Sequence, residues 1–297
     1  MNILISGGSG FIGHFLSQQL LTKKHTVKIV TRVAHQHQSS PSLNFVGWDA
    51  ESLQTAINGS DVVINLAGKG LFEQRWNERV KQELLDSRIN STQALVTAIR
   101  KSPSPPKQFI SASAVGFYGD TGHQLTDESH PPHASDFSST LCQRWEEEVS
   151  QLPSEMRISI ARLGIVLHPL GGALHRLLPA FKWGLGGALG NGNQYFPWIH
   201  IKDAINALTF PIENPNISGV YNVCAPQPIT NKAFSQQLAK QLGRPCWFNV
   251  PKTLLKLSLG ESSALLLNSA CIDPVVLKKQ GFQWQFPSME TALASFF

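Results

Sequence analysis

The stretch Asn2-Ile-Leu-Ile-Ser-Gly-Gly-Ser-Gly-Phe-Ile-Gly13 decides the fold of this chain. A short apolar run leads into a G-x-x-G-x-x-G pattern, and an apolar segment with helical spacing follows. Gly7 permits a tight turn, Gly10 lets a pyrophosphate approach the backbone, and Gly13 lets the helix pack closely on the strand. The helix N-terminus would then face the phosphates with its partial positive charge. The residues expected at the phosphates are Gly7, Ser9, Gly10, Phe11, Ile12 and Gly13.

Short β-prone runs alternate with longer helical stretches through residue 163, which predicts a doubly wound parallel sheet of the Rossmann type in an α/β protein. The predicted strands are Asn2–Ser6, Thr26–Thr31, Leu43–Val46, Val62–Leu66, Gln108–Ser111 and Arg157–Leu163. The predicted helices are Phe11–Leu21, Trp76–Ile99 and Thr140–Gln151. The proline-rich segment 101–107 predicts a surface turn.

After residue 164 the chain becomes rich in glycine, proline and aromatic residues. We expect a substrate-facing lobe there, and a long connecting loop is the alternative. A helix from Asp203, a strand at Val220–Val223 and a helix at Asn231–Leu242 follow. This predicts a nucleotide-binding domain at 1–165 that also takes in part of 199–223, a smaller lobe at 166–246 and a helical extension at 247–297.

Composition and charge narrow the class of protein. The 297 residues are 42% hydrophobic, which is enough for a full core, and no apolar run reaches the length of a membrane span. The first residues lack a signal-peptide pattern, so we expect a cytoplasmic protein without a membrane partner. Four widely spaced cysteines predict no metal site. Residues 151–297 hold 12 Lys and Arg against 6 Asp and Glu, but these cations are too scattered to predict nucleic-acid binding.

The end of the second predicted strand points to the choice of cofactor. A site for NAD places an acidic residue there to accept the ribose 2′-hydroxyl, but this chain has Arg32, which suits a 2′-phosphate. The pattern therefore predicts NADP(H). Asp49 could reach the adenine edge or cap the helix that follows it, and both alternatives stay open. The fourth strand ends in the run Asn65-Leu66-Ala67-Gly68. Its small residues would let the cofactor lie across the carboxyl end of the sheet.

Several stretches resemble the extended, atypical short-chain dehydrogenases/reductases, and among them the nucleoside-diphosphate-sugar epimerase-like subfamily with an extra C-terminal domain. They include Ile5–Gly13, Ile64–Gly68, Asp86–Thr92, Ile110–Asp120, Arg162–Leu167, Gly171–Ala173, Trp198–Asp203 and Tyr221–Val223. The resemblance implies further cofactor neighbours, namely Thr31, Arg32, Leu66, Ala67, Glu83, Arg88 and Arg162. For Glu83 and Arg88 a solvated helix face is the alternative.

The superfamily's Tyr-x-x-x-Lys dyad, in which the lysine lowers the tyrosine pKa for proton transfer, is missing from this chain. Alignment with the dyad's helix puts Ser138 at the tyrosine position and Cys142 at the lysine position. Ser113 and Tyr118, at and after the end of the fifth strand, are the catalytic candidates that remain. Cys142 has no cation one turn away and is expected to be an inert core thiol.

Two residues after the glycine-rich segment are candidates for substrate contacts. Trp198, in an aromatic run, could stack on a ring, with core packing as the alternative, and His200 could bind substrate together with Asp203. Asp203 could equally serve as a carboxylate in the first turn of a helix.

Two functions follow from these features. The first is an NADP(H)-dependent epimerase-like or reductase-like enzyme acting on a small molecule, with a nucleotide sugar as one candidate. The second is a non-catalytic NADP(H)-binding sensor or partner-binding protein, since relatives in the subfamily have also carried a cell-division-inhibitor label. The sequence does not specify the substrate, the direction of hydride transfer or the oligomeric state.

Overall fold

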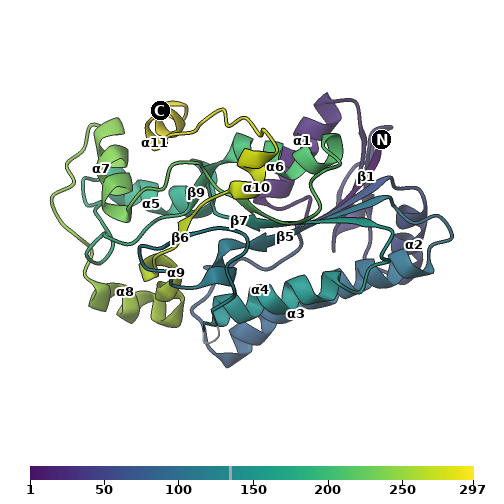
Figure 1. Ribbon diagram of the computed structural model, residues 1–297, viewed down its shortest axis with the longest axis horizontal. Helices are drawn as coiled ribbons and strands as arrows, with labels where there is room; N and C mark the ends of the chain where they lie inside the picture. Colours follow the sequence, from purple (N-terminus) through teal and green to yellow (C-terminus); the bar gives the residue numbers. More distant parts are fainter. Residues whose placement is uncertain (134–135) are drawn as a thin grey trace.

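A parallel sheet of seven strands forms the centre of the computed structural model, which describes residues 1–133 and 136–297 (Figure 1). Its strand order is β10-β7-β5-β4-β1-β2-β3, and every pairing between neighbours is parallel. The strands are β1 (Asn2–Ser6), β2 (Thr26–Val30), β3 (Leu43–Val46), β4 (Val62–Asn65), β5 (Gln108–Ala114), β7 (Arg157–Leu163) and β10 (Gly219–Val223). The order reverses direction between β1 and β4, which is where such sheets bind nucleotides. The predicted fold class is confirmed.

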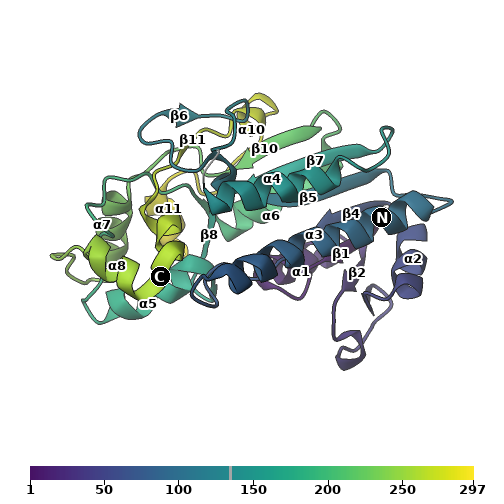
Figure 2. The same ribbon diagram turned by 90° about the horizontal axis from the view of Figure 1, so that it is seen from below.

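Helices cover both faces of the sheet. One face packs against α1 (Phe11–Thr22), α6 (Ile201–Glu213) and α10 (Val275–Lys279), and the other against α2 (Ala50–Asn58), α3 (Glu78–Lys101) and α4 (Phe137–Val149). The long helices α3 and α4 lie side by side in both views (Figures 1 and 2). Because both faces are covered, the central strands β1 and β4 are buried and mostly apolar.

A second region lies at the end of the molecule opposite α2 (Figure 1). Its helices are α5 (Gly172–Lys182), α7 (Asn231–Gln241), α8 (Lys252–Leu259), α9 (Ala264–Leu267) and α11 (Met289–Ala294). Two short parallel pairs join distant segments, β8 (Ile165–His168) with β9 (Trp198–His200), and β6 (Leu125–Thr126) with β11 (Cys271–Ile272). A separate apolar core from α5, α7 and α11 holds this region together.

Two predictions about helices need correction. The glycine-rich segment was predicted without a helix, but it contains α5, whose buried Leu174, Leu178 and Phe181 lie on one helical face. Pro179 inside the helix hides this pattern, because proline normally interrupts helices. The helix predicted to begin at Thr140 begins at Phe137, because the Asp136 carboxylate accepts a hydrogen bond from Ser138 N at 2.8 Å and caps it.

A buried chain of hydrogen bonds holds the switch point of the sheet. Ser6 Oγ donates to Asn65 Oδ1 (2.6 Å), and Asn65 Nδ2 donates to Thr92 Oγ1 (2.9 Å). Trp145 Nε1 also donates to Thr92 Oγ1, at 3.1 Å. One hydroxyl on α3 therefore joins β1 and β4 to α4.

No helix in the described part of the chain is long and apolar enough to span a membrane.

Thr92→Val should destabilise the protein by about 2 to 4 kcal/mol, because it keeps the shape of the side chain but leaves two buried N–H donors without an acceptor. Urea unfolding followed by circular dichroism measures this free energy. Thr22→Val is the matched control, since the exposed Thr22 hydroxyl bonds only to Gln18 O in its own helix. The control should stay within about 0.5 kcal/mol of the wild type. Equal effects of the two substitutions would show that the Thr92 chain does not hold the switch point.

Candidate cofactor site

The glycine turn lies at the carboxyl end of β1, directly against the end of β4. Gly7 has φ of +73°, and a Cβ there would lie 2.7 Å from the carbonyl carbon of Leu66. A Cβ on Gly13 would lie 2.3 Å from Gly7 O. Side chains are thus excluded at both positions, so the tight turn at Gly7 and the close helix packing at Gly13 are confirmed. At Gly10 a Cβ would meet only Gly7 O, at 3.2 Å, so the space beside Gly10 is open to a ligand.

Helix α1 begins at Phe11 without a side-chain cap and has no acidic residue in its first turn. Its first N–H groups therefore retain their positive potential at the turn. Ser9 is exposed at the tip, while Ile12 packs against the core. The Phe11 ring lies against Gly171, where a Cβ would come within 2.3 Å of the ring. Phe11 thus connects the phosphate turn to the start of α5.

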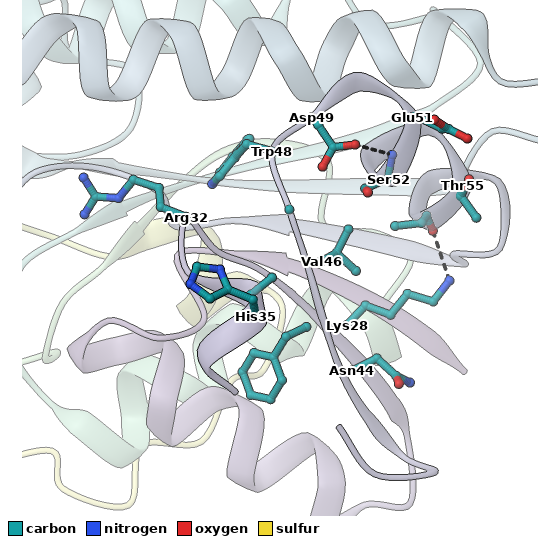
Figure 3. A pocket seen from close by; sticks show the side chains of 14 residues that line it. Lys28, Arg32, His35, Asn44, Val46, Trp48, Asp49, Glu51, Ser52 and Thr55 are labelled. Carbon is teal, nitrogen blue, oxygen red and sulfur yellow. Dashed lines mark hydrogen bonds between the residues drawn. The ribbon is translucent and has the colours of Figure 1, made fainter. Parts of the chain in front are cut away.

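The end of β2 carries an exposed cation. Arg32 is exposed, and no ion pair joins it to any residue in 1–133 or 136–297. It lines an open hollow of about 850 Å³, together with His35, Trp48 and Asp49 (Figure 3). Thr31 beside it is buried. A phosphate that binds the Arg32 guanidinium would therefore not have to displace a carboxylate of the described chain from it.

Asp49 has a structural role at the rim of this hollow. Its carboxylate accepts a hydrogen bond from Ser52 N at 2.9 Å and caps α2, and this bond lowers the pKa of Asp49 (Figure 3). Of the two alternatives for Asp49, the helix cap is the one that the structure shows.

A second cation lies beside the end of β4. Ala67 is buried, and a Cβ on Gly68 would lie 3.0 Å from Arg88 Cζ. The Arg88 guanidinium donates to the carbonyl oxygens of Leu84 and Lys69, both at 3.0 Å, and lies over the Trp145 ring. Burial lowers the pKa of Arg88, and within the described chain no carboxylate pairs with it. Arg88 is therefore a buried group rather than part of a solvated helix face.

Glu83, one helical turn before Arg88, belongs to an ion-pair cluster. It bonds Lys69 Nζ at 2.6 Å and Arg79 Nε at 3.0 Å, and these two cations lower the pKa of Glu83. Its carboxylate is partly exposed and its charge is balanced within the protein. Its partner Lys69 directly follows Gly68, so Glu83 lies close to the carboxyl end of β4.

Ser113, Tyr118 and Arg162 meet in one buried network, in which Glu146 of α4 is the central acceptor. Ser113 Oγ donates to Glu146 Oε1 at 2.6 Å. The Arg162 guanidinium grips the same carboxylate with two bonds, from Nε at 2.9 Å and from Nη2 at 2.8 Å. Such bidentate bonds fix the orientation of both side chains. The network joins β5, β7 and α4 below the carboxyl edge of the sheet.

The Tyr118 hydroxyl lies at the other end of this network. It accepts from Arg162 Nη1 at 2.9 Å and donates to Asn222 Oδ1 at 2.8 Å. The side chain is 1% exposed, and burial raises the pKa of Tyr118 to about 12. Ser113 is 2% exposed. In this structure both predicted catalytic hydroxyls donate to protein acceptors, Ser113 to Glu146 and Tyr118 to Asn222.

Ser138 and Cys142, which the alignment put at the tyrosine and lysine positions of the dyad, both lie on α4. Ser138 Oγ donates to Asp136 Oδ1 at 2.7 Å. Cys142, one turn later, is buried, and burial together with the nearby Glu146 raises the pKa of its thiol to about 11. Cys142 therefore stays protonated and unreactive near neutral pH, as expected for a core thiol.

The two predicted substrate contacts are buried in the lobe. Trp198 is 1% exposed and packs in the core of α5 and α7. His200 caps α6 by accepting from Lys202 N, and its ring stacks on Phe286 at 3.8 Å. Neither ring offers a surface to a substrate in this conformation, and core packing, the alternative for Trp198, is what the structure shows. Asp203 is also buried, and it accepts bonds from the backbone of the C-terminal segment rather than from a ligand.

Glu146 and Asn222 are the network members that the sequence prediction missed. A signal for Glu146 exists, since it follows Cys142 by four residues and therefore lies on the same face of α4. Asn222 lies in the resembling stretch Tyr221–Val223, but no local pattern links it to Tyr118, because only the pairing of β10 with β7 brings the two together.

The fold and the glycine turn define a dinucleotide-binding α/β protein with a second region at the carboxyl ends of its strands. Residues 3–224 match the NAD dependent epimerase/dehydratase family, and residues 250–296 match DUF1731, a domain of unknown function. The chain therefore belongs to the NAD dependent epimerase/dehydratase family. The resemblance seen in the sequence is confirmed, including the extra C-terminal domain.

Similar proteins carry the name epimerase family protein. The chain is 37% identical to SDR39U1 of Mus musculus, covering 99% of this chain and 98% of the relative. It is 36% identical to YfhF of Bacillus subtilis, covering 99% and 97%. A crystal structure of human SDR39U1 with NADPH matches with a TM-score of 0.91 at 35% identity, covering 100% of this chain and 99% of that one.

Acid should destabilise the protein through His200. Burial, with help from Lys202 and His168, lowers the pKa of His200 from 6.5 to about 3. Between these two values the unfolded chain binds one more proton, so this group's contribution to the free energy of unfolding falls by about 1.4 kcal/mol per pH unit as pH decreases.

His200→Asn keeps a capping side chain but cannot titrate in this range. Urea unfolding at several pH values should show the stability advantage of the wild type over this variant shrinking from pH 6 to pH 4. Exposed His35→Asn is the control and should leave the pH dependence unchanged. A constant difference between wild type and His200→Asn across this range would contradict a neutral, buried His200.

Proposed function

We propose that this protein binds NADPH at the carboxyl edge of its sheet. The observation that carries the proposal is Arg32 at the end of β2, which is exposed and has no ion-pair partner among residues 1–133 and 136–297. It lies next to a glycine turn that leaves room for phosphates at Gly10. The uncapped start of α1 supplies N–H donors for the pyrophosphate. Buried Arg88 supplies a further cation without a carboxylate partner in the described chain. The similar human protein crystallised with NADPH supports the same cofactor.

Arg32→Ala should weaken NADPH binding by roughly ten- to a hundredfold, because a charged contact to phosphate contributes about 1.5 to 3 kcal/mol. NADH binding should barely change, since NADH lacks the 2′-phosphate. Isothermal titration calorimetry with both cofactors measures the two effects. Arg100→Ala, which removes an exposed arginine at the far end of α3, is the control for net charge. Equal losses for NADPH and NADH would place the 2′-phosphate elsewhere.

The chemistry we propose is reduction of a carbonyl group on a small molecule, with a nucleotide sugar as one candidate substrate. When bound, NADPH supplies the hydride for the carbonyl carbon, and the oxygen takes a proton. Oxidation in the reverse direction needs a group that accepts a proton near neutral pH. Tyr118, with a pKa of about 12, and the Ser113 hydroxyl do not supply one. A neutral hydroxyl can still donate a hydrogen bond to a carbonyl if it exchanges its protein acceptor for the substrate.

The second candidate function is NADPH binding without turnover, as a sensor or partner-binding protein. The observation that favours it is that Ser113 and Tyr118 both donate to internal acceptors, Glu146 and Asn222. In that case Ser113, Tyr118, Glu146 and Arg162 serve to hold the strands around the nucleotide.

NADPH oxidation by a panel of aldehydes, ketones and keto-sugar nucleotides separates the two candidates. For the enzyme, we expect carbonyl reduction, with NADP⁺-dependent alcohol oxidation at pH 7 slower by on the order of a hundredfold or more, since the high pKa of Tyr118 makes it a poor general base at that pH. Ser113→Ala and Tyr118→Phe should lower kcat more than they lower NADPH affinity. Tight NADPH binding with no turnover across the panel would support the sensor, and rapid alcohol oxidation at pH 7 would contradict the proposed chemistry.

A further inference from the structure

Exposed apolar side chains come mainly from two neighbouring segments of the lobe. Six of the eleven large apolar side chains that are exposed in the described chain come from two segments, 183–185 and 247–257. Trp183 and Trp247 are 82% and 81% exposed, although tryptophan is normally well buried. We call this surface the lobe face, and its apolar members are Trp183, Leu185, Trp247, Phe248, Leu254 and Leu257.

The two segments of the lobe face are neighbours in space. Val250 N donates to Ala188 O at 2.8 Å, and Gly190 N donates to Val250 O at 2.9 Å. A Cβ on Gly184 would lie 3.7 Å from the Pro245 ring. The apolar side chains therefore share one region, and both views place α5 and α8 at the same end of the molecule (Figures 1 and 2).

Cations outnumber acidic residues in the segments that form this region. Residues 164–260 contain eight Lys and Arg but only two acidic residues, Asp203 and Glu213. Asp203 is buried, and its carboxylate accepts bonds from the backbone of the C-terminal segment. Glu213 pairs with Lys23, the residue that follows α1. Neither acid offsets the exposed cations that accompany the lobe face, which are Lys182, Arg244, Lys252 and Lys256.

We propose that the lobe face docks on the surface of an anionic lipid bilayer. Exposed tryptophan, phenylalanine and leucine can enter the boundary between headgroups and acyl chains, while lysine and arginine contact anionic headgroups. A second copy of this chain would bring the same cations together and is disfavoured by their repulsion. A bilayer offers both the apolar layer and the opposite charge.

The placement leaves the nucleotide site clear of the membrane. Helix α5 starts beside Phe11 at the glycine turn and ends at the lobe face, and its 11 residues span roughly 16 Å. The expectation that the protein has no membrane partner rested on the lack of a spanning segment. Docking through side chains needs no spanning segment, so the lobe face changes that expectation.

Sedimentation with lipid vesicles tests the proposal. The full chain should bind vesicles made of equal parts phosphatidylglycerol and phosphatidylcholine, should bind phosphatidylcholine vesicles weakly, and should dissociate as salt is raised. The double variant Trp183→Ser/Trp247→Ser should lower the partition coefficient by at least about tenfold, because each indole loses its burial in the interface. Lys252→Gln/Lys256→Gln should lower it several-fold.

Matched controls separate the lobe face from general surface effects. Leu125→Ser/Leu170→Ser removes exposed apolar side chains elsewhere, and Lys101→Gln/Lys107→Gln removes the same charge at a distant surface. Both controls should bind vesicles like the wild type. The proposal is overturned if the wild type does not bind anionic vesicles, or if the controls weaken binding as much as the lobe-face variants. Analytical ultracentrifugation tests the other occupant of this surface. A wild-type dimer that the tryptophan double variant abolishes, together with no vesicle binding, would assign the lobe face to a second copy of the chain and overturn the proposal.

Discussion

The ion pair between Arg162 and Glu146 is the interaction on which the carboxyl edge of this sheet depends. Two hydrogen bonds from one guanidinium fix the orientation of a buried carboxylate, and the side chains bonded to that carboxylate are then held in place as well. Ser113 bonds to the same carboxylate, and Tyr118 bonds to the other side of the guanidinium. Removal of either charge would leave its partner buried and uncompensated, which costs several kcal/mol. The pair therefore sets the positions of β5, β7 and α4 relative to one another.

Backbone bonds to buried carboxylates attach the C-terminal segment in a similar way. Asp203 of α6 accepts from Gln285 N and Phe286 N at 2.8 and 2.9 Å. Glu128 accepts from Asn222 N at 2.9 Å and from Val276 N. Burial raises the pKa of both carboxyl groups, while these backbone donors favour the charged form. The DUF1731 region is thus held to the nucleotide-binding fold by specific polar contacts as well as by apolar packing.

Charge compensation separates the charged residues whose partners lie within the protein from those whose charge is left without a carboxylate partner among the described residues. Arg162 and Glu83 have their charges balanced by neighbouring side chains. Arg32 and Arg88 have no carboxylate partner in the described chain, and they lie at two points along the edge where a dinucleotide would cross. Uncompensated cations beside a glycine turn suit phosphates, and this contrast favours NADPH binding over any particular reaction.

The sequence alone determined the sheet and the glycine turn, and it placed the arginine on which the proposed cofactor choice rests, because these features depend on local patterns. Apolar runs, three glycines at fixed spacing and one arginine after a strand can all be recognised without a partner segment. The order of the predicted strands along the chain also follows from them. The burial of Cys142 agrees with the expected core thiol, and the lack of a cation one helical turn away on either side is visible in the sequence.

Only the tertiary structure decided what Ser113, Tyr118 and His200 do. Their hydrogen-bond partners are Glu146, Asn222 and Ser295, which lie 33, 104 and 95 residues away in the chain. Whether a hydroxyl points at a ligand or at an internal acceptor depends on which segments pack against it, and no local pattern records such long-range contacts. The same reason applies to the lobe face. Its two segments are held near each other by a β-bridge between Leu189 and Val250, which are far apart in the sequence.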